Sequence, residues 1–429
     1  MTVVSSRSLK HISAFCFAMA SLATTGSARA ASETVVYSFT GGTDGAEPSA
    51  GLINIGGTLY GTTAFGGGSN NCPGGDGFPF GCGSVFSVTP AGAETVVYSF
   101  KSEPDGAYPY AGLTDVGGTL YGTTFDGGSV NDGTVFNVTL AGAETVVHSF
   151  TGGSDGALPS ADLIKFGGTL YGTTSVGGGS AKCTGGGGEP PGCGTVFKVT
   201  KAGTEKVLHS FGRPGDGIEP SGGLVSIGGT FYGTTSFGPG ANGLGTVFSV
   251  TTTRKEAVVY SFKGGSDGLS PSGNLINVDG TLYGTTILGG GAGSCEATGC
   301  GTVFTVTPAG AEAVVYSFRG SNDGAEPKAG LINVGGTLYG TTRFGGGSAN
   351  CPGADGNPSG CGTVFRVTKA ATETVVYAFK GGSDGAYPNG LINVGGTLYG
   401  TTAAGGGSDN CLGSYPNGPG CGTVFAVMP

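Results

Sequence analysis

The chain has 429 residues, 94 of which are glycine, and a formal net charge of −9 at pH 7. The excess of acidic residues argues against binding to nucleic acid or to an anionic membrane surface. The glycines follow no three-residue period, which excludes a collagen-like helix, and they instead separate short apolar segments typical of β-strands.

The first thirty residues have the features of a secretory signal. Arg7 and Lys10 provide a basic start, an apolar run covers residues 12–23, and Ala28 and Ala30 form an A-x-A cleavage site. We therefore predict cleavage after Ala30 and a single mature domain, residues 31–429, that is secreted, periplasmic or on the cell surface. The apolar run is too short for a transmembrane helix, and no later segment predicts one. Because three of the 19 basic residues lie in the signal, the formal net charge of the mature chain is −12.

One motif of the form ETVVYSF recurs seven times along the mature chain. Each copy is followed by GGxDGAxP, then by GLINVGGTLYGTT and then by GTVFxVT, and mainly the loop between GTT and GTVF changes in length. Glycine pairs and PAGA segments are turn signals, so each repeat predicts four short antiparallel strands. The mature chain has no segment with helical periodicity and is predicted to be all-β. The copies begin at Glu33, Glu94, Glu144, Glu205, Glu256, Glu312 and Glu373.

The phase of the repeat predicts a closed ring. Residues 34–39 form a fourth strand with no earlier strands before it, whereas residues 423–427 form a third strand with no fourth strand after it. Pairing of these two segments would complete a seventh blade and leave no free sheet edge. We therefore predict a seven-bladed β-propeller of four-stranded antiparallel blades, closed by the N-terminal strand 34–39 joining the last blade. An open solenoid is the alternative.

The recurring GGTLYGTT, GTVFxVT and ETVVYSF segments resemble the Gloeo/Verruco (GloVer) repeat of exported bacterial proteins, the choice-of-anchor tandem-repeat proteins. The resemblance covers nearly the whole mature chain in seven near-copies. It implies a secreted or surface-displayed repeat protein, and it does not imply a particular activity.

The ten cysteines of the mature chain occur as five close pairs, each within one repeat. An even number of cysteines in an exported chain indicates disulfides, and pairing within each loop is the simplest connectivity. Zinc is the less favoured interpretation, because a structural zinc site needs four ligands and each loop offers two cysteines and no histidine. The predicted pairs are Cys72 and Cys82, Cys183 and Cys193, Cys295 and Cys300, Cys351 and Cys361, and Cys411 and Cys421.

The GGxDGAxP segment places one aspartate in each repeat. Aspartate and glycine together are typical of turns, because the carboxylate accepts backbone N–H bonds and glycine adopts positive φ. A ring of carboxylates that binds Ca²⁺ is the weaker alternative, since calcium needs six to eight oxygen ligands. We therefore expect no cofactor, with Ca²⁺ as the one open candidate. The aspartates are Asp44, Asp105, Asp155, Asp216, Asp267, Asp323 and Asp384.

Departures from the repeat are candidates for ligand binding. They lie next to the loop proline or just after GTT, on the face expected to carry the longer loops. Polar and aromatic residues gathered there could hold a glycan or a peptide, whereas drift at exposed loop positions is the simpler explanation. The candidates are Tyr108, Tyr110, Glu326, Lys328, Arg343, Tyr387 and Asn389.

Two observations argue against a hydrolase of the serine type. GGSDG matches G-x-S-x-G, but the nucleophile elbow requires a following helix, and none is predicted. The two histidines of the mature chain, His148 and His209, occupy the tyrosine position of VVYSF and are interpreted as packed strand residues.

We therefore favour an exported, non-catalytic and monomeric propeller that acts as a binding or surface-interaction module for an extracellular glycan or protein. The alternative is a secreted carbohydrate-active enzyme, a lyase or hydrolase, that uses the aspartate ring with Tyr108 or Tyr387 on the long-loop face. A catalytic site needs unlike residues that converge at one place, whereas the repeats mostly offer like residues around a ring.

Overall fold

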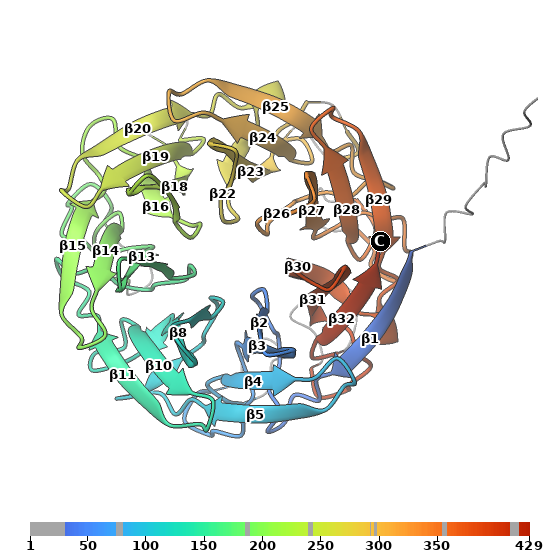
Figure 1. The fold of residues 1–429 in the computed structure, drawn as a ribbon, viewed down its shortest axis with the longest axis horizontal. Helices are drawn as coiled ribbons and strands as arrows, with labels where there is room; N and C mark the ends of the chain where they lie inside the picture. The colour runs from blue at the N-terminus through green and yellow to red at the C-terminus, as the bar shows by residue number, and fades with distance from the viewer. Residues whose placement is uncertain are drawn as a thin grey trace, which may run out of the picture. The chain divides into compact units, whose positions relative to one another are not determined.

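The computed structural model describes residues 31–73, 80–184, 189–238, 243–291, 293–295, 298–353, 358–411 and 420–429. The predicted signal peptide, residues 1–30, lies outside the described residues. The chain divides into two units, Met1–Ala30 and Ala31–Pro429. In the second unit, antiparallel sheets follow one another around a ring (Figure 1). No helix in the described part of the chain is long and apolar enough to cross a membrane.

Seven sheets form the blades of a β-propeller, as the repeat predicts. Blade 1 contains β2 (Ile53–Ile55), β3 (Thr58–Thr63), β4 (Ser84–Val88) and β5 (Glu94–Ser99), and blade 2 contains β7 (Thr114–Asp115), β8 (Thr119–Thr124), β10 (Thr134–Thr139) and β11 (Glu144–Ser149). Blade 3 contains β12 (Ile164–Phe166), β13 (Thr169–Thr174), β14 (Thr195–Val199) and β15 (Glu205–Ser210), and blade 4 contains β17 (Val225–Ile227), β18 (Thr230–Phe237), β19 (Thr246–Thr251) and β20 (Glu256–Ser261).

The last three blades follow the same order. Blade 5 contains β22 (Ile276–Val278), β23 (Thr281–Leu288), β24 (Thr302–Val306) and β25 (Glu312–Ser317), and blade 6 contains β26 (Ile332–Val334), β27 (Thr337–Thr342), β28 (Thr363–Thr368) and β29 (Glu373–Ala378). Blade 7 contains β30 (Ala386–Val394), β31 (Thr397–Ala404), β32 (Thr423–Met428) and β1 (Ser32–Ser38). Short additional pieces are β6 (Gly106–Ala107), β9 (Asp126–Gly127), β16 (Ile218–Pro220), β21 (Leu269–Pro271), η1 (Gly265–Asp267) and η2 (Gly382–Asp384).

The ring closes through the two ends of the chain, as the phase of the repeat predicts. Strand β1 pairs with β32 in antiparallel register, from Ser32 opposite Met428 to Ser38 opposite Thr423. Figure 1 shows the blue β1 beside the red β32. Blade 7 therefore combines three strands from the end of the chain with one from its beginning.

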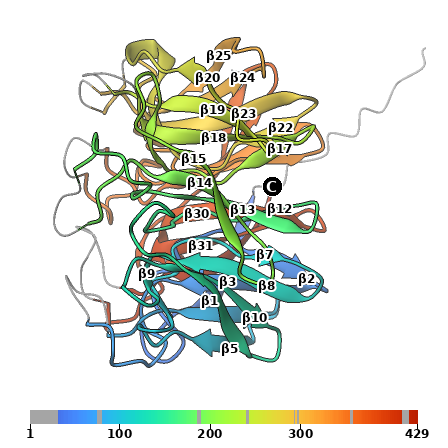
Figure 2. The same ribbon diagram turned by 90° about the vertical axis from the view of Figure 1, so that its left-hand side faces the viewer.

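Tight hairpins join the first two strands of each blade. In blade 1, Gly56 and Gly57 have φ values of 60° and 91°, and the side-chain oxygen of Asn54 accepts the Gly57 N–H at 3.0 Å. Two successive positive φ values characterise the type I′ turn, which matches the twist of antiparallel strands. In the side view of Figure 2, the β2, β12 and β17 ends of the blades lie on one side of the ring, and β9, from the loop between β8 and β10, lies on the other.

Each outer strand carries a β-bulge that the sequence did not reveal. In blade 1, Val96 pairs with Phe86 and Tyr98 pairs with Val85, so that Val97 is left between them. The bulge reverses the alternation of side chains, which explains why the ETVVYSF segment is apolar without a two-residue period. All seven outer strands have the same register shift.

Phenylalanine pairs connect successive blades. The last residue of each ETVVYSF motif packs edge-to-face on the phenylalanine of the third strand in the next blade, with ring centroids 4.9–5.1 Å apart. Phe39 contacts Phe86 in this way, and Phe379 contacts Phe425, so the closing blade uses the same contact as the others. Such pairs contribute about 0.5–1.5 kcal/mol beyond the burial of their area.

The five predicted disulfides are present with the predicted pairing. They join Cys72 to Cys82, Cys183 to Cys193, Cys295 to Cys300, Cys351 to Cys361, and Cys411 to Cys421. Each closes a loop between the second and third strands of one blade. Disulfides of this kind persist in oxidising compartments, which agrees with export.

A glycine in the second strand of each blade makes room for a phenylalanine ring, and we expect Gly284→Ala to destabilise the fold. A methyl group there would lie 2.7 Å from both Leu275 and Phe304. Such overpacking costs roughly 1–3 kcal/mol, measurable by urea denaturation. The exposed change Ala313→Thr, which installs the residue of the first repeat, is the control and should be neutral. Equal stability of the two variants would contradict this account.

Candidate functional site

The seven loops that link the outer strand of one blade to the next blade hold a residue in an unusual backbone conformation. This residue precedes the loop proline and has φ between 52° and 60° in all seven loops. An L-residue rarely adopts positive φ, and the following proline restricts it further. Strained backbone of this kind is concentrated at functional positions. The residues are Glu47, Tyr108, Leu158, Glu219, Ser270, Glu326 and Tyr387.

A hydrogen bond repeated in every blade holds this conformation. The N–H of Glu47 donates to the carbonyl of Cys421, and that of Tyr108 donates to the carbonyl of Cys82. The other five residues make the equivalent bond. The framework therefore fixes the backbone of these blade-linking loops, while the side chain at this position changes from blade to blade.

An aromatic group occupies the loop into blade 2. Tyr108 lies between Phe65 and Tyr110, with ring centroids 5.3 and 6.5 Å away, and Tyr110 contacts Phe125 at 5.5 Å. Burial raises the pKa of Tyr108, and the negative charge of Asp126 adds to the effect. Both phenols are therefore neutral and present hydroxyl groups beside an apolar surface.

A charged group occupies the loop into blade 6. Arg343 lies 3.7 Å from Glu326, and its guanidinium is 5.0 Å from the ring centre of Phe344 and 5.9 Å from that of Tyr387. Lys328 is exposed. Surrounding protein lowers the pKa of Lys328, as does the positive charge of Arg343, whereas Glu47 and Glu326 oppose this shift. The exposed ammonium of Lys328 is accessible to a polar ligand.

Glu47 connects these two groups electrostatically. Burial raises the pKa of Tyr110, and the negative charge of Glu47 raises it further. The same carboxylate favours the charged form of Lys328. Contacts also link these loops. Arg343 lies over the ring of Tyr387, and Asn389 of the same loop donates to the carbonyl of Pro48 next to Glu47. Tyr110 contacts Phe65 of blade 1. We call Glu47, Tyr110, Glu326, Lys328 and Arg343 the axial cluster.

The candidate residues Tyr387 and Asn389 make contacts with neighbouring loops. Tyr387 is only 2% exposed and packs against Phe344 at 5.4 Å, so it supports Arg343 rather than facing solvent. The side chain of Asn389 donates to the carbonyl of Pro48 at 2.7 Å and thereby ties the loop into blade 7 to the loop into blade 1.

The loop aspartates make the hydrogen bonds expected of turn-forming residues. Asp44 accepts the hydroxyl of Tyr37 at 2.9 Å and the backbone N–H of Thr40 at 2.7 Å. Asp105 accepts bonds from Tyr98 and Lys101 in the same way. In the outer strands of blades 2 and 3 the histidines replace the tyrosine, and His209 lies 3.1 Å from Asp216.

We expect Asp105→Ala to destabilise the protein by about 1–3 kcal/mol, because it leaves the N–H groups of Lys101 and Gly106 without their acceptor. Asp105→Asn keeps one oxygen acceptor and should lose less. Thermal unfolding with and without EDTA measures both effects. A loss of stability that appears only in the presence of Ca²⁺ would support the cation alternative instead.

The match to a known repeat covers most of the chain. The family model of the Gloeobacter/Verrucomicrobia repeat matches residues 23–186 and 182–415. The chain belongs to this repeat family. No curated protein matches it.

Solved structures similar to this Gloeobacter/Verrucomicrobia repeat protein share little sequence with it. The phage phi92 endosialidase is 11% identical, with a TM-score of 0.46 over 92% of this chain and 68% of the endosialidase. A puromycin-hydrolysing peptidase of Mycobacterium tuberculosis is 10% identical, with a TM-score of 0.47 over 87% of this chain. The chain spans about half, 52%, of the peptidase. At these values neither structure indicates an activity for this protein.

In this protein of the Gloeobacter/Verrucomicrobia repeat family, carboxyl groups also lie close together across blades, which the sequence did not predict. Glu94 begins the outer strand of blade 1. It faces Tyr37 in the outer strand of blade 7 and Asp44 in the loop that leads from blade 7 into blade 1. Burial raises the pKa of Glu94 to about 7, and the charge of Asp44 raises it further, while a hydrogen bond with Tyr37 lowers it. The first glutamate of each ETVVYSF motif has one buried oxygen with no hydrogen-bond partner among the described residues. The invariance of this glutamate across the repeats was the available signal.

Two residues that replace a repeated glycine form hydrogen bonds between the blade-linking loops. Asp162 accepts the N–H of Gly112 at 2.5 Å and the side-chain amide of Asn274 at 2.6 Å. Asn274 in turn accepts the N–H of Gly223 at 2.6 Å. Asp162 and Asn274 occupy a position at which the other repeats have glycine. Their hydrogen bonds link the loops that lead into blades 2, 3, 4 and 5. The sequence contained this signal, but it does not show that the two residues meet.

Proposed function

We propose that this protein is an exported, non-catalytic and monomeric binding module that holds a glycan at the axial cluster. The observation that carries the proposal is the series of contacts between neighbouring loops. Tyr110 contacts Phe65 of blade 1, and Arg343 lies over Tyr387. Asn389 of the same loop as Tyr387 donates to the carbonyl of Pro48 beside Glu47. At the position of Tyr110 and Lys328, four of the other loops have serine, at Ser49, Ser160, Ser221 and Ser272. The cluster therefore departs from the repeat, and the loops that carry it differ chemically from the loops of the other blades.

The chemistry of the cluster suits a sugar. A half-buried tyrosine ring provides an apolar face with a polar edge, on which a pyranose ring can stack. The carboxylate and the two cationic groups offer hydrogen bonds to hydroxyl or carboxylate substituents. The loop aspartates, by contrast, are held by their own blades in equivalent positions, an arrangement that supports loop structure rather than one reaction centre.

A glycan screen with the mature chain tests the proposal. The variants Tyr110→Ser and Lys328→Ser each install the residue found in four other loops, so they should fold normally. We expect each to weaken binding of the selected glycan by about tenfold, the effect of losing one contact of about 1.4 kcal/mol. Ser272→Ala is the matched control in a loop outside the cluster.

Three results would contradict the proposal. Unchanged affinity in the Tyr110→Ser/Lys328→Ser double variant would place the site elsewhere. Binding of peptides and of no glycan would assign a different ligand class. Release of shortened glycan products during the assay would favour the lyase or hydrolase.

A further inference from the structure

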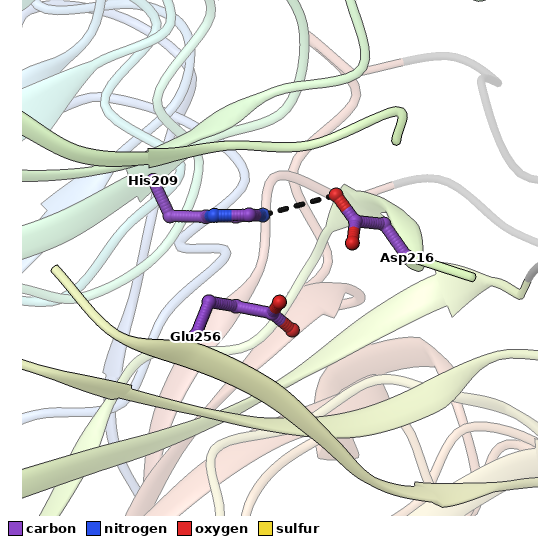
Figure 3. A group of neighbouring side chains, drawn as sticks. All are labelled: His209, Asp216 and Glu256. Carbon is purple, nitrogen blue, oxygen red and sulfur yellow. Dashed lines mark hydrogen bonds and ion pairs between the residues drawn. The ribbon is translucent and has the colours of Figure 1, made fainter. Parts of the chain in front are cut away.

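Three side chains with metal-binding atoms meet at the boundary between blades 3 and 4. His209 lies near the end of β15, Asp216 lies in the loop that follows, and Glu256 begins β20. Figure 3 shows the ends of these side chains directed toward one another. The ligand atoms lie within 4.8 Å of one another, and His209 Nε2 is 3.1 Å from Asp216 Oδ2. This boundary contains none of the axial cluster residues.

Histidine at this position changes the chemistry of a contact that is otherwise repeated. In five blades a tyrosine occupies the place of the histidine, and its hydroxyl donates to the loop aspartate. A phenol must lose its proton to become a strong metal ligand, whereas a neutral imidazole has a lone pair available. Burial lowers the pKa of His209, although Asp216 opposes this shift.

A buried oxygen at this boundary is available to a cation. One carboxylate oxygen of Glu256 has no hydrogen-bond partner among the described residues, as in the other motif glutamates, and here a histidine–aspartate pair with a 3.1 Å contact also lies beside it. His209 and Asp216 are only 5% and 6% exposed, whereas Glu256 is partly exposed. A buried carboxylate without a partner is unfavourable, and a bound cation would satisfy it.

We propose that His209, Asp216 and Glu256 form a binding site for a divalent transition-metal ion, with Zn²⁺ as the preferred ion. One imidazole nitrogen and two carboxylate oxygens are ligands that Zn²⁺ accepts, and water would complete the tetrahedron. Calcium prefers oxygen ligands alone, so the histidine favours a transition metal. Ligands on a tetrahedral Zn²⁺ are about 3.3 Å apart, so the Glu256 side chain closes in slightly when the ion binds.

The neighbouring boundary provides an internal comparison. His148, Asp155 and Glu205 occupy the equivalent positions between blades 2 and 3, but His148 Nε2 is 3.5 Å from Asp155 Oδ2. The longer distance indicates a less well-formed group. We therefore assign the tight site to His209 and expect His148 to contribute little.

The test is Zn²⁺ binding to the metal-stripped mature chain, purified without a histidine tag. We expect isothermal titration to show one site with a Kd of micromolar or below, and the melting temperature to rise by several degrees in excess Zn²⁺. His209→Tyr installs the residue present in five other blades. It should keep the melting temperature of the metal-free protein and lose at least 100-fold in Zn²⁺ affinity.

Two further variants make the assignment specific. Glu256→Gln keeps the shape of the side chain and should weaken Zn²⁺ binding at least tenfold. His148→Tyr is the matched control and should bind Zn²⁺ as the wild type does. Absence of Zn²⁺ binding in the wild type, undiminished binding in His209→Tyr, or loss of binding in His148→Tyr would each overturn the proposal.

Discussion

A chain that begins at Ser49, and so lacks β1, is expected to unfold at much lower temperature and to self-associate. The deletion removes the six-residue pairing between β1 and β32, which runs from Ser32 to Ser38. It also removes the contact of Phe39 with Phe86 in blade 1. Loss of a buried phenylalanine alone costs about 3–5 kcal/mol, and the unpaired edge of β32 becomes available to another chain.

Light scattering after size exclusion, together with thermal unfolding, measures both effects. A circular permutant is the control: it joins Pro429 to Ala31 and opens the chain in the turn at residues 90–93. Because Ser32 pairs with Met428, a short linker can join the ends, and every blade keeps four strands. The permutant should remain a stable monomer. A monomeric and equally stable deletion variant would argue for an open solenoid.

Stability is expected to fall as the pH rises from 5 to 8. Burial raises the pKa of Glu94, Glu144 and Glu373 to about 7, and the facing loop aspartates raise it further. The same causes, burial first, raise the pKa of Glu33 to about 8 and that of Glu312 to about 7.

The sign follows from proton uptake. Between pH 4.5 and 7 the folded chain binds more protons at these glutamates than the unfolded chain does, so stability is greatest below the unfolded pKa and is lost as the pH rises through the folded pKa. Because these glutamates are only about half-buried, solvent screening reduces the contribution of each to the change in unfolding free energy to about 1 kcal/mol. Ionisation of all five glutamates as the pH rises from 5 to 8 should therefore lower the unfolding free energy by several kcal/mol.

Urea denaturation at constant ionic strength, in EDTA, provides the measurement. Lys101, Lys263 and Lys380 lower the pKa of the nearest glutamates and reduce the slope. The buried His209 acts in the opposite direction, because its pKa is lowered, so the His209→Tyr background isolates the glutamates. Glu94→Gln should stabilise the protein at pH 8 and leave it unchanged at pH 5, whereas Glu103→Gln in an exposed loop should do neither. A stability that increases with pH throughout this range would refute the assignment.

The sequence predicted the architecture because the repeat encodes contacts that are local to a blade. The Gly56–Gly57 turn, the cysteine pairs and the phase of residues 34–39 all follow from neighbours along the chain. Contacts between blades were not accessible in this way. Glu94 meets Asp44 across 50 residues, and Asp162 meets Asn274 across 112. A bulge at Val97 reverses the faces of the outer strand, so its side-chain directions could not be inferred from alternation.

The candidate site was predicted only in part. Departures from the repeat singled out Tyr110, Lys328 and Arg343 as candidates, and their role in binding stays a prediction. They did not reveal Glu47, because glutamate recurs before the proline in the repeats at Glu219 and Glu326. His148 and His209 were interpreted as packed strand residues. They are strand residues, and the additional feature is that each faces a loop aspartate in the fold.

The closure of blade 7 has a consequence for biogenesis. If the chain crosses a membrane from its N-terminus, β1 emerges first and must remain unpaired until β32, the last strand, follows. Blades 1 to 6 can assemble in the order in which they appear, but the ring cannot close before β32 has crossed. Exposure of β1 to a chaperone or protease during this interval would report whether β32 has arrived. Sealing of the ring surface therefore waits for the strand that lies farthest from β1 along the chain.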